Sequence, residues 1–531
     1  MKSGETSKVM SAEAAAALVP DGATVLVDGS GGGVNEPGLV LAALEARFSR
    51  EQHPAGLTVV HPSGVGDGQG GGIDRFAHSG MVSKAIGGHW NWAPRMQRMA
   101  LAGEIEAYCL PQGVLSHLFR AIAGHAPGVI THIGLGTFVD PRLDGGRLNA
   151  RSRDEMVRLM PIDGREYLFY PAFRIDVAIV RGTTADEMGN VTMEGEGLYA
   201  ETLSAAQAAR NSGGIVIAQV RQVVRSGSLD PRVVKVPGVL VDAVVAYPEQ
   251  RLSVATAEDA SLTGAQRVSE TDMAPLPLSE RKVIARRAAA ELRRGDIVNL
   301  GYGMPDGAAA VLAEEHLSDQ VTFTVEQGHI GGVPATGSDF GMARNQMAMV
   351  DAGYQFDWYN GGGLDVAILS FAEVDPRGNV NVSKFGGRIA GIGGFVNISQ
   401  GARRVVFVGT LRAGRQQLQF TADGIRIEQE GKSAKFVPQL EQISFSGDYA
   451  RLWGVPVTYV TERAVFQLED GGLVLTELAP GLDLERDVLR QMGFRPRVSD
   501  RLKTMDARIF AAARMGLQLA QQPPKPAAQR T

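Results

Sequence analysis

An ordered internal repeat constrains the fold of this 531-residue chain more than any other feature. Residues 21–27 (DGATVLV) resemble residues 294–300 (RGDIVNL), and both segments follow an alanine-rich helical pattern and run into glycines. Residues 175–180 (IDVAIV) resemble residues 364–369 (LDVAIL), and a Gly-Asn turn and a short alternating strand follow each copy. The copies occur in the same order in both halves. The repeat therefore predicts two homologous domains.

The spacing of the copies indicates that the first half carries an insertion. The first pair is offset by 273 residues and the later pairs by 189 or 190 residues, so the first copy holds about 84 additional residues. We expect most of this insertion between the glycine cluster at 64–72 and Tyr170.

Short apolar runs alternate with helical patterns in both halves, as in TVLV, LTVV, VTFTV and VVFV. Such runs are typical of parallel strands whose two faces are covered by helices. The sequence therefore predicts two homologous open α/β domains with mostly parallel sheets. We expect an N-terminal domain at 1–270, a C-terminal domain at 271–520 and a disordered proline-rich tail at 521–531. In such sheets, ligands bind beyond the carboxyl ends of the strands.

Charge and cysteine content limit the possible partners. The 53 basic and 58 acidic residues give a net charge of −5, which provides no basic footprint for nucleic acid. The densest basic stretch, at 281–294, follows a helical pattern and favours a solvated helix face over a phosphate-binding patch. Cys109 is the single cysteine, so neither an intramolecular disulfide nor a multi-thiolate metal site is expected. No apolar run is long enough for a membrane span and no secretory signal is recognisable, so we expect a cytoplasmic protein without a membrane partner or a metal.

Glycine is over-represented and clustered. The chain has 66 glycines, about 29 more than average usage gives, in clusters at 29–33, 64–72, 328–332, 361–363 and 391–394. Because glycine lets the backbone pass close to a ligand, these clusters predict backbone-lined pockets. The apolar run at 321–325 ends in Glu326, and a glycine loop opens directly after it. Glu326 can be a solvated loop acid or a helix cap, but converging glycine loops also suit covalent catalysis by the carboxylate itself.

Several longer motifs resemble one known family. The strings TVEQGHIGGVPATG (324–337), GGGLDVAIL (361–369), GNVNVSKFG (378–386) and IAGIGGFVNISQ (389–400) are similar to family I coenzyme A transferases. The resemblance points to the branch of propionate and acetate/3-ketoacid CoA-transferases with both halves fused in one chain. It implies that Glu326 is the nucleophile of a ping-pong reaction through a glutamyl-CoA thioester. It also implies that coenzyme A is a substrate and that no cofactor is tightly bound.

The resemblance further implies a set of binding residues. A CoA side in the second domain would comprise Gly301, Gly303, Gly361, Gly362, Gly363, Gly391, Gly393 and Gly394, the last three in a loop that contacts the CoA arm and the oxyanion. The segment at 31–37 (GGGVNEP) would face the acyl group through Gly31, Gly32, Gly33 and Asn35. His329 and the segment at 192–199 (TMEGEGLY) depart from the pattern of relatives, which gives His329 a possible contact with substrate and an effect on carboxylate specificity.

The sequence thus predicts a CoA-transferase that moves CoA between short-chain acids such as acetate and propionate. Two alternatives stay open at this point: an acyl-CoA hydrolase that uses the same glutamate, and a non-enzymatic small-molecule sensor of related fold. The resemblance implies a homo-oligomer, with a tetramer expected. The glycine run at 64–72 has two interpretations, a wall on the acyl side or a long turn.

Overall fold

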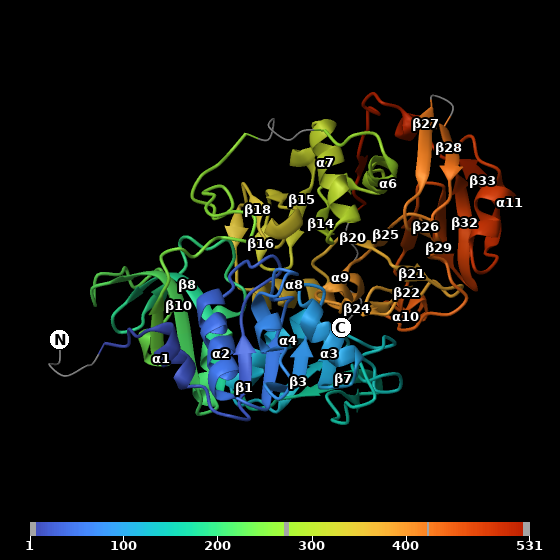
Figure 1. Cartoon of the computed structure of the whole chain (residues 1–531). Coiled ribbons are helices and arrows are strands. Elements are labelled where there is room, and N and C mark those ends of the chain that lie inside the picture. The colour runs from blue at the N-terminus through green and yellow to red at the C-terminus, as the bar shows by residue number, and fades with distance from the viewer. Residues whose placement is uncertain (1–6, 270–274, 422–423, 524–531) are drawn as a thin grey trace.

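Two mostly parallel sheets, one from each half of the chain, are stacked with helices between them (Figure 1). The structure is a computed structural model that describes residues 7–269, 275–421 and 424–523. In Figure 1 the first half is blue to green and lies below the second half, which runs from yellow-green to red. The expected boundary between the domains, at 270 and 271, lies outside the described residues.

The centres of the two sheets have the same strand order. In the first half, β1 (Thr24–Val27) lies between β2 (Leu57–His61) and β8 (Val177–Asp186), and all pairings are parallel. In the second half, β14 (Ile297–Leu300) lies in the same way between β15 (Thr322–Val325) and β20 (Val366–Ser370). The sheets are completed by β3 (Val82–Gly87), β4 (Glu106–Cys109), β9 (Val191–Thr192), β10 (Ile215–Val224), β11 (Val234–Val236) and β12 (Ala243–Ala246) in the first half, and by β16 (His329–Ile330), β19 (Ala348–Met349), β25 (Val405–Val408), β30 (Val457–Val460), β31 (Ala464–Glu469), β32 (Gly472–Leu478) and β33 (Arg497–Thr504) in the second.

The repeated aspartate has the same structural role in both halves. Asp176 precedes β8, and its Oδ2 accepts a hydrogen bond of 2.9 Å from the N–H of Thr24 at the start of β1. Asp365 precedes β20, and its Oδ2 accepts a hydrogen bond of 3.0 Å from the N–H of Ile297 at the start of β14. A strand-initial N–H that lacks a ladder partner is thereby satisfied in each copy. The predicted fold class is confirmed.

The segment expected to hold the insertion lies between β2 and β8. It extends the first sheet through β3 and β4 and adds the helices α3 (Pro94–Leu101) and α4 (Gln112–Ala123). It also forms a separate antiparallel sheet of β5 (Gly128–Thr131), β6 (Arg158–Ile162) and β7 (Arg165–Pro171). The loops that follow β3 and β4 therefore lie at the same edge of the sheet as the loop that follows β1.

The core joins the two halves. One apolar cluster contains residues of both sheets and of the helices between them, and α4 packs against α8 (Ala352–Asn360). A second cluster covers the other face of the second sheet beneath α6 (Glu280–Ala289) and α7 (Gly307–Glu314). The remaining helices are α1 (Ala12–Ala17), α2 (Gly38–Glu51), α5 (Thr202–Asn211), α9 (Phe395–Gly401), α10 (Gly447–Leu452) and α11 (Leu484–Asp487). None of the helices in the described part of the chain is long and apolar enough to cross a membrane.

The basic helix α6 differs from its expected role. Arg286 is fully buried, and its guanidinium donates hydrogen bonds of 2.6 Å and 2.8 Å to the carbonyls of Ala511 and Ala513. The prediction of a solvated face was wrong because a segment more than 200 residues later folds over this helix. The tail also begins differently from the prediction: Ala520–Gln521 form β34, which pairs with β13 (Arg293–Arg294), so the expected disorder does not begin at Gln521. Residues 524–531 lie outside the described residues.

Candidate active site

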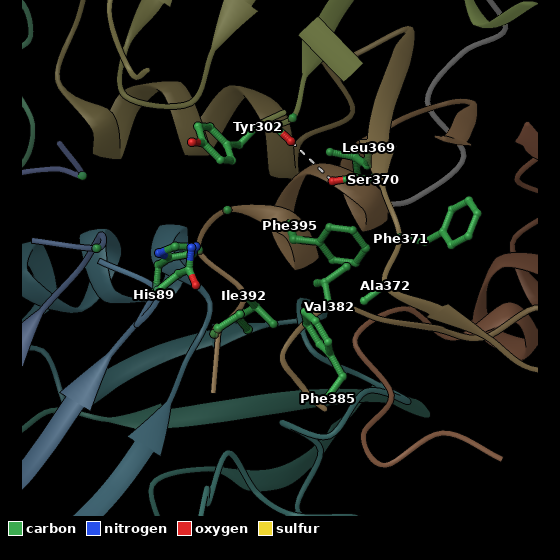
Figure 2. A pocket seen from close by; sticks show the side chains of 18 of the residues that line it. His89, Tyr302, Leu369, Ser370, Phe371, Ala372, Val382, Phe385, Ile392 and Phe395 are labelled. Atoms are coloured by element: carbon green, nitrogen blue, oxygen red, sulfur yellow. Dashed lines mark hydrogen bonds between the residues drawn. The ribbon is translucent and has the colours of Figure 1, made fainter. Parts of the chain in front are cut away.

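A cavity of about 650 Å³ lies between the two halves at the carboxyl ends of their strands. Figure 2 shows His89 and Tyr302 on one side of it, and Phe371, Phe385 and Phe395 gathered on the other. Both halves contribute to the lining, with Ser30, Gly31, Ser63, Gly64, His89, Trp92 and Gln112 from the first and Gly301, Tyr302, Glu326, Gln327, Phe340, Gly391, Gly393 and Gly394 from the second.

Glu326 lines this cavity directly after β15 and is only 7% exposed. Its Oε2 accepts a hydrogen bond of 3.3 Å from Nδ2 of Asn299, which lies on the adjacent strand β14. Burial raises the pKa of Glu326, while hydrogen bonds from its own backbone, Asn299 and Gln327 lower it. The carboxylate is thus shielded from water and held by donors that favour its ionised form.

A hydrogen-bonded network supports Asn299 from behind. Asn299 also lies 3.4 Å from the hydroxyl of Tyr359, which donates to Oγ1 of Thr324 at 2.7 Å. Gln355 donates to the same hydroxyl at 2.9 Å. Burial raises the pKa of Tyr359, so its hydroxyl stays protonated and acts as a donor. The network fixes the two strand ends that carry Glu326 and Asn299.

The glycine loop at 391–394 lies between β24 (Arg388–Ile389) and α9, beside Glu326. The N–H of Gly391 donates to the carbonyl of Ser383 at 3.0 Å, and that of Gly393 to the carbonyl of Gly88 at 2.7 Å. These two amides are therefore engaged within the protein. The N–H of Gly394 makes no hydrogen bond among the described residues, and a Cβ placed on Gly394 would lie 3.3 Å from Cγ of Glu326. The loop therefore passes so close to the Glu326 side chain that an added methyl group would press on it.

Of the other glycines predicted to bind CoA in the second half, one lines the cavity and four do not. Gly301 lines the cavity, but its N–H already donates to the carbonyl of Ile368 at 2.9 Å. Gly303 does not line the cavity, and its carbonyl accepts a hydrogen bond from Arg281. The structure does not bring the remaining three to Glu326, because they precede β20 and lie at the amino end of a parallel strand, on the opposite edge of the sheet: Gly361, Gly362 and Gly363.

In the first half, only part of the predicted acyl-facing segment reaches the cavity. Gly31 lines it. Gly32 and Gly33 lie behind it, where added Cβ atoms would meet the carbonyl of Ser338 at 2.1 Å and Cγ1 of Val254 at 3.0 Å. Asn35 is buried with a φ of 54° and donates to Oγ1 of Thr202 at 3.4 Å. These residues shape the loop from behind.

His329 is fully buried on β16 and does not line the cavity. Burial lowers its pKa to about 4, and a contact with the backbone of Gly197 opposes this shift. The two departures from the family pattern, His329 and the segment at 192–199, therefore contact each other. His329 is a neutral packing residue behind the site, which does not support a direct contact with substrate.

Sequence reasoning missed the lining residues of the insertion. His89 and Trp92 follow β3, and Gln112 follows β4, so all three lie beyond the carboxyl ends of parallel strands. That position was the available signal, but it required knowing that the inserted strands extend the first sheet. Lys435 and Arg388, at the far end of the cavity, were missed as well, and burial lowers the pKa of Lys435 to about 8.

Fold and site together define a class of protein. No group of three or more histidine, cysteine, aspartate or glutamate side chains within the described ranges is arranged to hold a metal ion. The site instead offers a buried carboxylate, donors that stabilise negative charge, and a cavity formed by two duplicated halves. This is a two-domain α/β enzyme with a water-shielded carboxylate in its interdomain cavity.

Comparison with known proteins gives the family. The family model for coenzyme A transferase matches residues 9–247. Acetate CoA-transferase YdiF of Escherichia coli (strain K12) is 44% identical over 512 residues, which cover 96% of each chain. Caffeate CoA-transferase of Acetobacterium woodii is 44% identical over 519 residues, which cover 96% of this chain and 99% of the relative.

A solved structure agrees over almost the whole chain. The crystal structure of the acyl-CoA transferase YdiF apoenzyme from Escherichia coli O157:H7 matches with a TM-score of 0.93 and 43% identity, covering 97% of this chain and 98% of that one. A thioester complex of YdiF with CoA matches with a TM-score of 0.92. The chain belongs to the coenzyme A transferase family and is a CoA-transferase. The resemblance identified from the sequence motifs is confirmed.

Proposed function

We propose that this CoA-transferase moves CoA between short-chain acyl-CoA thioesters and free carboxylates such as acetate and propionate, by a ping-pong route through Glu326. The observation that carries the proposal is the position of Glu326, a buried carboxylate at a strand end that faces the cavity between the halves. A relative named acetate CoA-transferase supports the substrate class.

The proposed chemistry needs no cofactor. The carboxylate of Glu326 attacks the acyl carbonyl, and the carbon–sulfur bond breaks. This step forms an acyl-glutamyl anhydride and releases CoA as the thiolate. The thiolate then attacks the glutamyl carbonyl, which releases the first carboxylate and forms a glutamyl-CoA thioester. An incoming carboxylate reverses these steps and leaves as the new acyl-CoA.

The site supplies what these steps require. Positioning alone can lower such a barrier by roughly 7–11 kcal/mol. The free N–H of Gly394 beside Glu326 suits a developing oxyanion. Burial of Glu326 limits hydrolysis of the anhydride and the thioester.

The two ends of the cavity differ in chemistry, which orients the substrate. Arg388 and Lys435 line the end formed by the second half, where Lys435 lies 4.2 Å above the ring of Phe371. Cations suit the phosphates of the CoA arm. The acyl group then points toward the opposite end, where Trp92 of the first half and Tyr302 of the second line the cavity, with Glu326 between the two ends.

The nucleophile is tested by trapping. The protein is incubated with propionyl-CoA and treated with borohydride, and peptide mass spectrometry is expected to find reduction at Glu326. Glu326→Gln should lower CoA exchange by more than about 1,000-fold, because the nucleophile is lost. Glu373→Gln is the matched control, since Glu373 lines the same cavity but is hydrogen-bonded to Asn381. An unmodified peptide together with an active Glu326→Gln enzyme would contradict the proposal.

Transfer and hydrolysis are separated by one comparison. Loss of the thioester is measured with and without acetate, and transfer requires that the loss depends on acetate. Equal rates would favour the acyl-CoA hydrolase. The non-enzymatic sensor is set aside because the family is enzymatic. Assembly into a homo-oligomer, with a tetramer expected, stays a prediction.

A further inference from the structure

Three aromatic side chains from both halves meet at the acyl end of the cavity. Trp92 follows β3, Tyr302 follows β14, and Phe340 follows a 3-10 turn at Gly337–Asp339. The ring centroids of Trp92 and Tyr302 lie 6.2 Å apart, and those of Tyr302 and Phe340 lie 5.2 Å apart, both edge to face. All three line the same cavity as Glu326, and we call them the aromatic wall.

The indole of Trp92 is seated on glycines. A Cβ on Gly31 would lie 2.1 Å from its Nε1, and a Cβ on Gly64 would lie 2.9 Å from its Cδ1. Gly68 donates its N–H to the carbonyl of Trp92 at 2.9 Å, and a Cβ on Gly66 would lie 2.6 Å from that oxygen. The glycine run at 64–72 thus holds the bulky side chain of Trp92 against the cavity. The indole cannot move away from the cavity, because the glycine backbone lies directly behind it.

The other two rings belong to segments that adjoin the Glu326 segment. Tyr302 lies at the end of the strand adjacent to the one that ends at Glu326. Phe340 precedes Gly341, where a Cβ would lie 3.4 Å from Cδ of Gln327, the residue after Glu326. Tyr302 is 48% exposed, and its hydroxyl makes no hydrogen bond among the described residues. Its contribution at this place is therefore its ring.

We propose that the aromatic wall limits the size of the acyl group that Glu326 accepts, with Trp92 as its fixed part. The inference rests on the proposed function, because it needs the acyl group to point away from the cations that hold the CoA arm. A short acyl group gains apolar contact with the rings. Each further methylene meets Trp92, whose ring is packed against glycine backbone, and a close-packed side chain resists displacement. Trp92 and Tyr302 are thus specificity-determining residues.

The test compares acyl chain lengths in the first half-reaction. Single-turnover formation of the covalent adduct on Glu326 is measured with propionyl-CoA and hexanoyl-CoA, so that no acceptor acid is involved. Trp92→Ala should raise the hexanoyl-to-propionyl rate ratio by at least about 10-fold, as expected when a pocket gains room for several methylenes. Tyr302→Ala should raise the ratio as well, whereas Tyr302→Phe keeps the ring and should leave it unchanged.

Controls keep the test decisive. Trp453→Ala removes an indole that lines a different cavity, and its ratio should equal that of the unaltered protein. The proposed role of the aromatic wall is contradicted if a folded Trp92→Ala protein still forms the adduct with propionyl-CoA but has an unchanged hexanoyl-to-propionyl ratio. That result leaves the proposed function standing. If Trp92→Ala does not fold, equal ratios for Tyr302→Ala and Tyr302→Phe contradict the role of the wall instead. Absence of any adduct in the unaltered protein contradicts the proposed function, and the wall with it.

Discussion

At Glu326 one side chain has to be buried enough to exclude water and ionised enough to attack. Burial raises its pKa, and hydrogen bonds from its own backbone, Asn299 and Gln327 oppose that shift. Because the carboxylate form is the nucleophile, activity should fall as the pH drops through this raised pKa. Asn299 donates from its side chain on the adjacent strand, so this donor can be removed without touching the backbone.

Asn299→Leu should therefore move the acid limb of the pH profile of kcat/KM to higher pH, and lower the activity near neutral pH. The side chain is replaced by one of similar size, so the change opens no large cavity but removes the 3.3 Å hydrogen bond to Glu326, together with the 3.4 Å contact with Tyr359. Asn91→Ala is the control, because Asn91 lines the same cavity and has no side-chain hydrogen bond to Glu326. An acid limb that stays in place or moves to lower pH would show that Asn299 does not stabilise the ionised carboxylate.

Glu326 could be found from the sequence because its position depends on local order alone. A strand-forming run, a carboxylate and a glycine loop are adjacent in the chain, and the strand end places them at a ligand-binding edge. Trp92 and Tyr302 gave no such signal, because their meeting depends on two strands more than 200 residues apart. His329 was assigned to the substrate from its closeness in sequence, but the chain turns after Glu326. His329 then pairs with the buried Val325 and is itself fully buried.

At the scale of elements, the glycine loop at 391–394 acts through close approach. A Cβ on Gly394 would lie 3.1 Å from Cδ1 of Ile398, 3.3 Å from Cζ of Phe356 and 3.3 Å from Cγ of Glu326. The φ of Gly394 is −80°, so alanine adds no backbone strain there. An added methyl group would therefore press on the Glu326 side chain as well as on Ile398 and Phe356.

Gly394→Ala should consequently lower kcat by about 10- to 100-fold, because small displacements of a reacting group are costly. Steady-state kinetics with propionyl-CoA and acetate measure the effect, and a melting curve checks that the fold persists. Gly124→Ala is the matched control, since Gly124 ends α4 at a φ of −88° and its nearest atom would be 3.5 Å away. Unchanged kcat in the Gly394 variant would refute close approach as the role of this loop.

The strands and helices were largely predictable from the sequence, but the contacts of the loops at their ends were not. The repeated Asp-Val-Ala segments became equivalent strands because each aspartate accepts a hydrogen bond from the start of its neighbour strand. The family resemblance assigned the glycines at 361–363 to the site, but they precede β20 and lie at its amino end. The loop of Gly391 and Gly393 was expected to face substrate, but the N–H groups of both residues donate hydrogen bonds to backbone carbonyls of other loops. Sequence shows which residues adjoin a strand, but the partner of each N–H depends on tertiary contacts.

At the scale of the whole molecule, a buried acidic pair of the first half lies next to the second half, where the N–H of Ala352 donates to the carbonyl of Ala200. Asp28 at the end of β1 accepts hydrogen bonds from Oγ1 of Thr202 at 2.6 Å and from the N–H of Glu201 at 3.3 Å. Ser116 on α4 donates to Glu201. Burial raises the pKa of Asp28 to about 6, and burial and the charge of Asp28 raise the pKa of Glu201 well above its usual value. The charge of Asp351, in the second half, contributes to both pKa shifts, so the second half adds to the cost of ionising the pair.

These shifts predict how stability depends on pH. A carboxyl group whose pKa is raised on folding binds its proton more tightly in the native state, so its contribution to the free energy of unfolding falls as pH rises from the unfolded value through the raised value. For Asp28 this window runs from 3.8 to about 6. For Glu201 it extends upward from 4.5. Ionisation of the pair therefore lowers the free energy of unfolding more at pH 8 than at pH 5.

Glu201→Gln should remove that cost, because glutamine resembles the protonated acid: its amide can donate to Asp28 and its carbonyl can accept from Ser116. We expect the variant to raise the melting temperature at pH 8 by about 2 °C or more and to change it much less at pH 5. Scanning calorimetry at the two pH values measures the difference. Glu249→Gln changes an exposed carboxylate and should shift neither transition. Equal shifts at both pH values, or a lower melting temperature at pH 8, would mean that Glu201 is ionised without cost at the junction of the halves.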